Sequence, residues 1–406
     1  MKDEKQYLTI SNIEEMLEKF YKNRDQLLLE FMFFPFFEAL KKEIEEKAGK
    51  KYKHDGQYYR WSSNPGSISV NGEKVRVKVP RIKDKQSGKV ETPEIYNRVK
   101  KNIHISERIM KKLLAGISQK RYKETAQELA NSFGLSQSSV SRIFTEEAEK
   151  YLKEFEGRKL NNYDILAIII DGKYLKKDQI VYAIGLTNTG YKIILGFIQT
   201  NTENTEAIKG LLKDLINRGL KYERGILFVT DGSKGIIKAI GEVFGKYAAI
   251  QRCQWHKREN VVSYLTEELK EKYRNKLQRA YLEPEYVIAK SRLLEIHKEL
   301  QMINRTASNS LLEGLEETLT IHKLGVRDEL GRSLGTTNII ESTNSQLASR
   351  LRRIKFWKSS QMIANWIAIN LLDIEKRMKR IHNYQRLKLL ELALIDYVSS
   401  NKHMVA

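Results

Sequence analysis

Hydrophobic and polar positions alternate with different periods along the chain. From residue 11 to 50, Leu, Ile, Phe and Met recur every three or four positions and the segment ends in glycine, which predicts helices. The stretch SISVNGEKVRVKVPRI, residues 67–82, instead alternates with a period of two around Asn71-Gly72. That pattern is typical of a β-hairpin with a two-residue turn.

A short polar turn separates two helical patterns between residues 120 and 152. Gly134 can adopt the positive φ of a tight turn, and Ser136 can cap the next helix. This layout predicts a helix-turn-helix, in which the second helix, residues 137–144, enters the major groove of DNA. Any two-helix hairpin with a glycine turn is the alternative. The outward residues of the second helix, and thus the candidate DNA contacts, are Gln137, Ser138, Ser139, Ser141 and Arg142.

From residue 161 to 253 the pattern becomes α/β. Five apolar, β-branched runs predict strands at ILAIIID, QIVYAIGLT, YKIILGFIQT, GILFVTD and YAAIQRC. Short turns join the first three runs, which predicts an antiparallel meander, and helical patterns at 204–216 and 233–244 separate the last three. We therefore expect a mixed five-stranded sheet, followed by a charged helical stretch at 257–335 and a last helical region at 337–399.

The charge balance indicates a polyanionic partner. The chain has 406 residues, with 72 basic against 51 acidic side chains and a net charge of +21. A soluble protein with a solvated lysine-rich surface is the alternative. Seven basic residues against one acid lie between Lys74 and Lys89, which suits DNA phosphates, although lysines guarding an exposed strand edge would look the same.

Cysteine content and hydropathy indicate the compartment. The single cysteine, Cys253, excludes an intramolecular disulfide and fits a reducing cytoplasm. No apolar run approaches the roughly 20 residues that a membrane-spanning helix needs. We expect a cytoplasmic protein with no membrane partner.

Two of the predicted strands end in an aspartate followed by glycine, at Asp171 and Asp231. One such aspartate is unremarkable because it commonly caps the following turn. Two in the same sheet suggest converging negative charge, which divalent ions such as Mg²⁺ relieve through carboxylate, water and phosphate oxygens. Two ions about 3.5–4 Å apart clamp the attacking and leaving oxygens of a phosphoryl transfer. The glycines would leave space for a nucleic-acid backbone.

A third acid usually completes such a site, and Glu341 is the best candidate by context. It lies in the first turn of a predicted helix within GTTNIIESTNSQLASRLRR. Asn338 and Glu341 also have the spacing of a capping box, so closing the helix end is the alternative role.

Basic residues flank these acids in two segments. In RCQWHKREN, residues 252–260, Cys253 and His256 supply only two of the four ligands of a structural zinc site. We expect His256 to orient the site or contact phosphate and Cys253 to pack beneath it, while Trp255 is either core or a stacking partner for a base. Ten basic and two acidic residues lie between Arg350 and Arg386. The candidate phosphate contacts are His256, Lys257, Arg258, Arg350, Arg352 and Arg353, with a solvated helix face as the alternative for the last three.

These motifs, in this order, resemble the bacterial insertion-sequence transposases of the Mutator-like superfamily, which carry a DDE triad on a ribonuclease-H-like fold. The resemblance is carried by IIIDGKY, FVTDGSKG, RCQWHKREN and TTNIIESTNSQL, and by the 110 residues from Asp231 to Glu341, which fit a helical insertion before the last acid. It implies that Asp171, Asp231 and Glu341 hold two Mg²⁺ (or Mn²⁺) ions. It also implies metal-dependent cleavage of the element's ends and strand transfer into target DNA, without a covalent protein–DNA bond.

The resemblance, which extends from about Val75 to Arg380, also implies a bacterial protein that is associated with the nucleoid when it binds DNA. Residues 1–50 contain no motif of the family that we recognise, and the interpretation of residues 51–98 rests on their charge and alternation. We expect an N-terminal helical region at 1–50, a basic β-hairpin region at 51–98, a helix-turn-helix domain at 99–155, the first part of an α/β ribonuclease-H-like core at 156–256, a helical insertion at 257–335, and the last catalytic helix with basic C-terminal helices at 336–406. The expected partners are the terminal inverted repeats, target DNA and a second copy of the chain on DNA. A non-catalytic DNA-binding regulator and a metal-dependent nuclease with the same fold stay open as alternatives.

Overall fold

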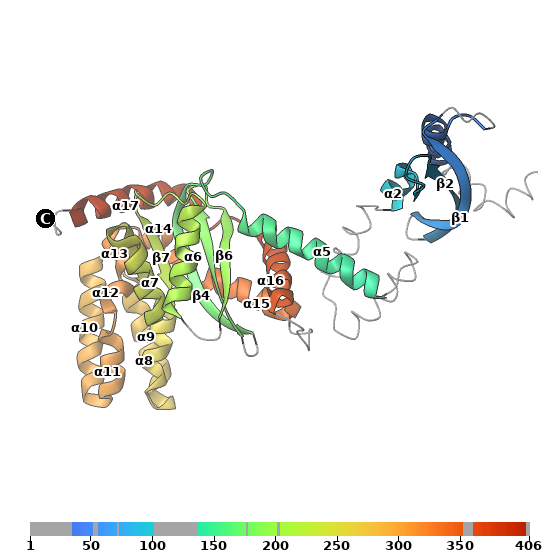
Figure 1. Cartoon of the computed structure of the whole chain (residues 1–406). Helices are drawn as coiled ribbons and strands as arrows, with labels where there is room; N and C mark the ends of the chain where they lie inside the picture. Colours follow the sequence, from blue (N-terminus) through green and yellow to red (C-terminus); the bar gives the residue numbers. More distant parts are fainter. Residues whose placement is uncertain are drawn as a thin grey trace, which may run out of the picture. The chain divides into compact units, whose positions relative to one another are not determined.

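A computed structural model describes residues 35–51, 56–70, 73–100, 137–175, 178–200, 204–351 and 360–402. The chain forms two compact units, which are described separately (Figure 1). The first comprises Met1–Leu113 with Tyr122–Phe144, and the second comprises Leu114–Arg121 with Thr145–Ala406.

The first unit contains the expected β-hairpin. Strands β1 (Tyr58–Val70) and β2 (Glu73–Asp84) pair antiparallel with Val70 opposite Glu73, and the predicted turn residues Asn71 and Gly72 lie outside the described ranges. A short strand β3 (Val90–Glu91) extends the sheet in the order β1-β2-β3, and α2 (Glu94–Lys100) follows. Strand β1 is longer than predicted and includes Pro65, which is tolerated because β1 is an edge strand. Buried residues of this hairpin share a core with residues 40–48 of the helix at 35–48.

The predicted helix-turn-helix falls mostly on residues that the structure does not describe. Its turn, with Gly134 and Ser136, and its first helix lie outside the described ranges. The expected second helix forms the start of α5 (Gln137–Glu156), a single helix of 20 residues. The helix continues because good helix formers follow residue 144 and the next glycine is Gly157. The helix-turn-helix therefore stays a prediction.

The second unit contains the expected mixed sheet of five strands, in the order β6-β5-β4-β7-β8 (Figure 1). Strands β4 (Ile165–Leu175), β5 (Asp178–Thr187) and β6 (Lys192–Thr200) form an antiparallel meander. Strands β7 (Ile226–Thr230) and β8 (Ala248–Arg252) run parallel to β4 and follow α6 (Thr205–Asn217) and α7 (Lys234–Phe244). One sequence-based boundary is wrong: β4 does not end at Asp171 but continues to Leu175, because its pairing with β5 continues.

Helices cover both faces of this sheet. Residues of β4 point alternately to opposite faces, so that Ile168 and Ile170 share a core with helices α6 and α7. The opposite face carries Tyr182, whose hydroxyl reaches the backbone of α15 (Asn338–Leu351). Strands buried on both faces read as nearly continuous apolar runs, which explains why the sequence predicted them well.

The charged stretch after β8 is helical, as expected. It comprises α8 (Gln254–Ser263), α9 (Glu267–Leu282), α10 (Tyr286–Ile303), α11 (Arg305–Leu312), α12 (Leu315–Thr318), α13 (Thr320–Lys323) and α14 (Arg327–Leu334) (Figure 1). Helices α8–α11 enclose an apolar core of their own. The chain then returns to the sheet with α15 and continues with α16 (Ser360–Glu375) and α17 (Leu387–Lys402). Among the described residues, no helix has the length and apolar character to cross a membrane.

Candidate active site

Asp171 and Asp231 lie at the same edge of two neighbouring parallel strands. The last residues paired between β4 and β7 are Ile170 and Thr230, and each aspartate is the next residue in the chain, Asp171 within β4 and Asp231 directly after β7. Neighbouring strands lie about 4.8 Å apart. The sheet therefore brings together two acids that are far apart in the sequence.

Asp231 also caps the turn that leads into α7. Its Oδ1 accepts hydrogen bonds from the Ser233 backbone N–H at 2.9 Å and from the Thr230 hydroxyl at 3.2 Å. Asp231 therefore caps this turn, as a lone aspartate commonly does, and the two hydrogen bonds fix the position of its carboxylate.

Glu341 lies in the first turn of α15 and is oriented by Thr337. The Thr337 hydroxyl donates a hydrogen bond to Glu341 Oε1 at 2.8 Å. The helix begins at Asn338, and the residue that donates to the Glu341 carboxylate is Thr337, four residues before Glu341. This contact differs from the one that the Asn338 capping-box spacing suggests, in which the glutamate side chain accepts from the cap's own backbone N–H.

A buried hydrogen-bond chain connects α15 to the first acid. Asn344, one turn after Glu341, donates from Nδ2 to Asp171 Oδ2 at 3.1 Å. Its Oδ1 lies 2.9 Å from the Tyr182 hydroxyl, which is also 3.0 Å from the carbonyl oxygen of Ile340. Tyr182 and Asn344 are both buried. The sequence analysis missed both residues, and the available signal was that Asn344 lies on the same helix face as Glu341.

Electrostatic coupling shows that the three acids converge. Asp171 is only 8% exposed, and burial raises its pKa to about 6, with further increases from the charges of Asp231 and Glu341. The charge of His256 and the backbone N–H of Gly172 act in the opposite direction on that pKa. The charges of Asp231 and Glu341 therefore make Asp171 harder to ionise, and a cation would stabilise such a site.

His256 and Cys253 lie beside this acidic cluster. His256 Nδ1 is 3.3 Å from the Thr337 hydroxyl, and Nε2 is 3.9 Å from Glu341 Oε1. Cys253 is buried, and its Sγ accepts a hydrogen bond from the Thr337 backbone N–H at 3.4 Å. The hydrogen bond with Cys253, together with the charges of Glu341 and Asp231, raises the pKa of His256 to about 9. His256 therefore brings a positive charge next to the acids at neutral pH.

Candidate ligand atoms in this cluster include both hard and soft donors. One atom each from Cys253, His256 and Glu341 lie within 4.8 Å of one another. The oxygens of Asp171, Asp231 and Glu341 are the donor type that Mg²⁺ and Mn²⁺ prefer, whereas the buried thiol suits softer ions. By donor type, the three carboxylates suit a hard divalent ion. Trp255, at 42% exposure, is not core, so that one of its two predicted roles is wrong.

The structure contradicts the predicted phosphate contact at Lys257. Its side chain is 1% exposed, and Nζ donates to the carbonyl oxygens of Ser310 at 2.8 Å and Glu313 at 2.5 Å. Burial lowers the pKa of Lys257 to about 8. The lysine fastens α8 to the end of α11. Its neighbour Arg258 donates to Glu259 at 3.0 Å and to Gln278, so a phosphate contact there would require these pairs to break.

The remaining DNA-contact candidates are only partly described. Arg350 forms an ion pair with Asp373 on α16 at 2.8 Å, and Arg142 is exposed on α5. Arg352 and Arg353 lie outside the described residues. The backbones of the other α5 candidates are helical and their side chains are not described; these are Gln137, Ser138, Ser139 and Ser141.

The glycines after the two aspartates make room for protein side chains rather than for DNA. Gly232 has φ +101°, and a Cβ there would lie 2.0 Å from Nε of Arg252. A Cβ at Gly172 would lie 2.7 Å from the side-chain nitrogen of Gln179. The buried Arg252 also donates to the carbonyl oxygen of Glu313 at 3.3 Å, so it links the Asp231 turn to the helical insertion.

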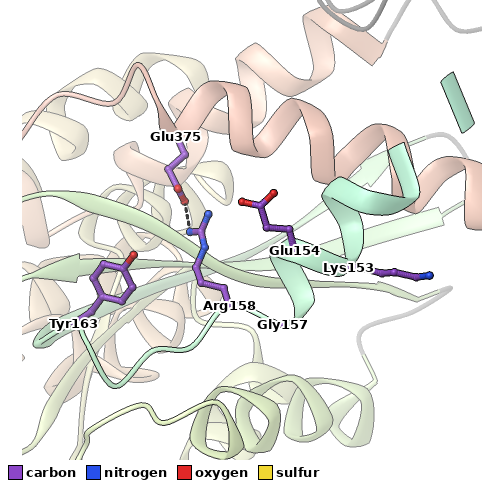
Figure 2. A pocket seen from close by; sticks show the side chains of 6 residues that line it. All are labelled: Lys153, Glu154, Gly157, Arg158, Tyr163 and Glu375. Carbon is purple, nitrogen blue, oxygen red and sulfur yellow. Dashed lines mark hydrogen bonds and ion pairs between the residues drawn. The ribbon is translucent and has the colours of Figure 1, made fainter. Parts of the chain in front are cut away.

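A surface hollow of about 600 Å³ lies elsewhere in the second unit and contains none of the three acids. Figure 2 shows the six residues that line it: Lys153, Glu154, Gly157, Arg158, Tyr163 and Glu375. Arg158 and Glu375 form an ion pair at 2.8 Å, and Glu375 also accepts the backbone N–H of Ile194 at 2.6 Å. These contacts fasten the segment after α5 to β6 and α16, which is a structural role.

A family model and several curated transposases match most of the chain. The family model described as "Transposase, Mutator family" matches residues 3–380. The transposase for insertion sequence element IS256 in transposon Tn4001 from Staphylococcus aureus is 23% identical over 345 residues, covering 82% of this chain and 84% of the relative. The transposase for insertion sequence element IS905 from Lactococcus lactis is 24% identical over 338 residues, covering 80% and 83%. The transposase for insertion sequence element IS1081 from Mycobacterium tuberculosis is 30% identical over 159 residues, 37% of each chain.

Proposed function

The chain belongs to the Mutator family of transposases, and from this premise we propose that it cuts the ends of an insertion sequence and joins them to target DNA with Asp171, Asp231 and Glu341 as its catalytic acids. The observation that carries this proposal is the convergence of the acids in the fold: Asp171 and Asp231 follow the last residues paired between two neighbouring parallel strands, and α15, which carries Glu341, donates a hydrogen bond from Asn344 to Asp171. Negative charges gathered in this way favour a bound cation.

We propose that the three carboxylates hold two Mg²⁺ or Mn²⁺ ions. When bound, such a pair activates the attacking oxygen and stabilises the leaving oxygen of a phosphodiester. Support comes from the donor type, because carboxylate oxygens are the preferred protein ligands of these ions. Support also comes from rigidity, because each acid accepts a hydrogen bond from the protein: Asp171 from Asn344, Asp231 from Ser233, and Glu341 from Thr337.

The protein's own groups would orient the reacting DNA. Asn344 and the Gly172 N–H hold the two oxygens of Asp171 in a fixed direction. His256 carries a positive charge beside Glu341 and Asp231, so we propose that it contacts a DNA phosphate or orients Glu341. A charge-assisted hydrogen bond to phosphate is stronger than one between neutral groups.

Further parts of the proposal concern recognition and assembly. The meander β4-β5-β6 followed by parallel β7 and β8 agrees with a ribonuclease-H-like core, and the helices α8–α14 agree with an insertion before the last acid. We propose that the start of α5 reads the terminal repeats in the major groove. Because two element ends must be brought together for joining, we also propose a dimer or higher oligomer on DNA.

The proposal is tested with purified protein, an end-labelled DNA carrying an element end, a target plasmid and Mg²⁺. We expect metal-dependent cleavage and a labelled strand-transfer product. Asp231→Asn should still bind the element end but give neither product, because it removes a charge from the proposed metal site and leaves α5 intact. Equal cleavage by Asp231→Asn would remove this residue from the site. Cleavage without joining would identify a nuclease, and binding without cleavage in any divalent ion would identify a regulator.

A further inference from the structure

Two aromatic rings are exposed on the outer face of the β1–β2 hairpin in the first unit. Tyr59 is 45% exposed and Trp61 is 56% exposed. The buried residues of the same hairpin, such as Val77 and Val79, form the core with the helix at 35–48. The rings are therefore not part of that core, and large exposed rings on one face of a sheet point to a binding role.

Two lysine ammonium groups lie against these rings. Lys83 Nζ is 4.2 Å from the centre of the Trp61 ring, and Lys85 Nζ is 5.1 Å from the centre of the Tyr59 ring. Tyr59 and Lys83 are directly paired across β1 and β2, so all four side chains share one face. A β-bulge between Arg60 and Ser62 gives Trp61 its place on this face, and Arg60 turns away to bind the carbonyl oxygen of Gly49 at 2.8 Å.

The positive charge continues along β2. Arg76 and Lys78 are exposed and alternate with the buried Val77 and Val79. In the pairing register they face Ser67 and Pro65 of β1, further from the hairpin's open end than the rings. Two further exposed cations thus lie on β2 between the ring pair and the start of the strand at Glu73.

We propose that Tyr59, Trp61, Lys83 and Lys85 form a binding surface for single-stranded DNA, with unpaired bases stacked on the rings and phosphates on the ammonium groups. Stacking on a side chain requires a base whose ring face is free, which duplex DNA does not offer. Direct reading of a duplex groove relies instead on Arg, Asn or Gln at base edges. Lys83 and Lys85 beside the rings, with Arg76 and Lys78 further along β2, favour a polyanionic ligand.

This proposal rests on the proposed function in one respect: cutting and joining element ends would create the unpaired strands that this surface binds. The binding itself is independent of the three acids. The competing explanation is that Lys83 and Lys85 shield β1, an edge strand, against pairing with other chains. In that case the rings would contribute nothing to DNA binding.

The test measures binding of full-length protein to a fluorescent 20-nucleotide oligo(dT) and to a duplex without terminal repeats, by anisotropy at several salt concentrations. The double variant Tyr59→Ala/Trp61→Ala should weaken oligo(dT) binding by roughly ten- to a hundredfold, at an unchanged salt slope, and leave duplex binding within about threefold. Tyr59→Phe/Trp61→Phe keeps both rings and should bind oligo(dT) within about threefold of the wild type. Lys83→Ala should reduce the salt slope for oligo(dT) by about 0.7, because it removes one phosphate contact.

Matched controls separate this surface from general effects. Tyr264→Ala removes a comparably exposed ring from the second unit and should leave oligo(dT) binding unchanged. Asp231→Asn should also bind oligo(dT) normally, so a failed catalytic proposal and a failed binding proposal give different results. The proposal is overturned if the alanine double variant binds oligo(dT) like the wild type, or if it loses oligo(dT) and duplex binding equally.

A second measurement does not depend on any variant. Wild-type protein is irradiated with an oligonucleotide containing 5-iododeoxyuridine, and the crosslinked residue is identified by mass spectrometry. We expect crosslinks at Trp61 or Tyr59. Crosslinks confined to other residues would overturn the proposal.

Discussion

Asn344→Ala is the sharpest test of how α15 holds the first acid in place. The substitution removes the donor to Asp171 Oδ2 and the acceptor that faces the Tyr182 hydroxyl. Both partners are buried, so water does not readily replace the lost amide. A hydrogen bond to a charged group contributes about 1.5–3 kcal/mol and a neutral one about 1 kcal/mol. We therefore expect the free energy of unfolding to fall by about 2–4 kcal/mol.

The same substitution should affect catalysis separately from stability. Without Asn344 the Asp171 carboxylate can rotate, and misplacement of a metal ligand weakens metal binding about 10–100-fold. We expect a higher half-saturating Mg²⁺ concentration and a cleavage rate lower by about one to two orders of magnitude at limiting Mg²⁺. Tyr182→Phe should give a smaller effect of the same kind, because it leaves the Asn344–Asp171 hydrogen bond in place.

Urea unfolding and Mg²⁺ titration of the cleavage rate measure these two effects. Asn365→Ala is the matched control, since Asn365 is a buried asparagine on α16 that accepts from Gln361 at 3.1 Å. It should lower stability without changing the Mg²⁺ requirement. If Asn344→Ala lowers stability but keeps the wild-type Mg²⁺ requirement and rate, the amide does not orient Asp171 and the reasoning is refuted.

Three further predictions concern the surroundings of the site. Gly232→Ala should lower the melting temperature and the cleavage rate, because it forces a side chain into φ +101° and against Arg252. Gly210→Ala is the control in α6: its added methyl group meets nothing within 4 Å, so it should be neutral or stabilising. Equal melting temperatures of the two variants would contradict this account. Lys257→Met should bind element ends with wild-type affinity at every salt concentration, and a loss of affinity with a reduced salt slope would restore Lys257 as a phosphate contact. The pKa of Lys257 is lowered to about 8 in the folded chain, so above that pH the unfolded chain binds more protons than the folded chain. In urea unfolding, the free energy of unfolding of the wild type should therefore rise by about 3 kcal/mol relative to that of Lys257→Met between pH 8 and 10.5. A difference between the two proteins that stays constant across this range would show that the lysine keeps its ordinary pKa.

The sheet was predictable because its central strands are buried on both faces. Burial of this kind demands nearly unbroken apolar residues, so the runs before Asp171 and Asp231 identify β4 and β7 from sequence alone. The end of β4 was not predictable in this way. Gly172 looks like a stop signal, yet the strand continues through it because the pairing with β5 continues to Leu175.

Long-range contacts account for the other differences between sequence and structure. Lys257 lies in a basic motif that suggests phosphate binding, and only its contacts with carbonyls more than 50 residues away reveal a structural role. Asn344 bonds to an acid 173 residues earlier in the chain, and a polar residue inside a helix carries no local sign of such a partner. Acidic residues could be proposed from spacing, but the residues that orient them could not.

Synthesis of the chain delivers the acids at different times. Asp171 and Asp231 emerge from the ribosome with the sheet, while Glu341 and the amide of Asn344 follow only after α8–α14 have been translated. An incomplete nascent chain, or one shortened by a premature stop codon before α15, therefore has two acids without the third or its supporting helix. Such fragments would retain the aromatic and basic hairpin of the first unit, so truncated products are expected to occupy DNA without cutting it.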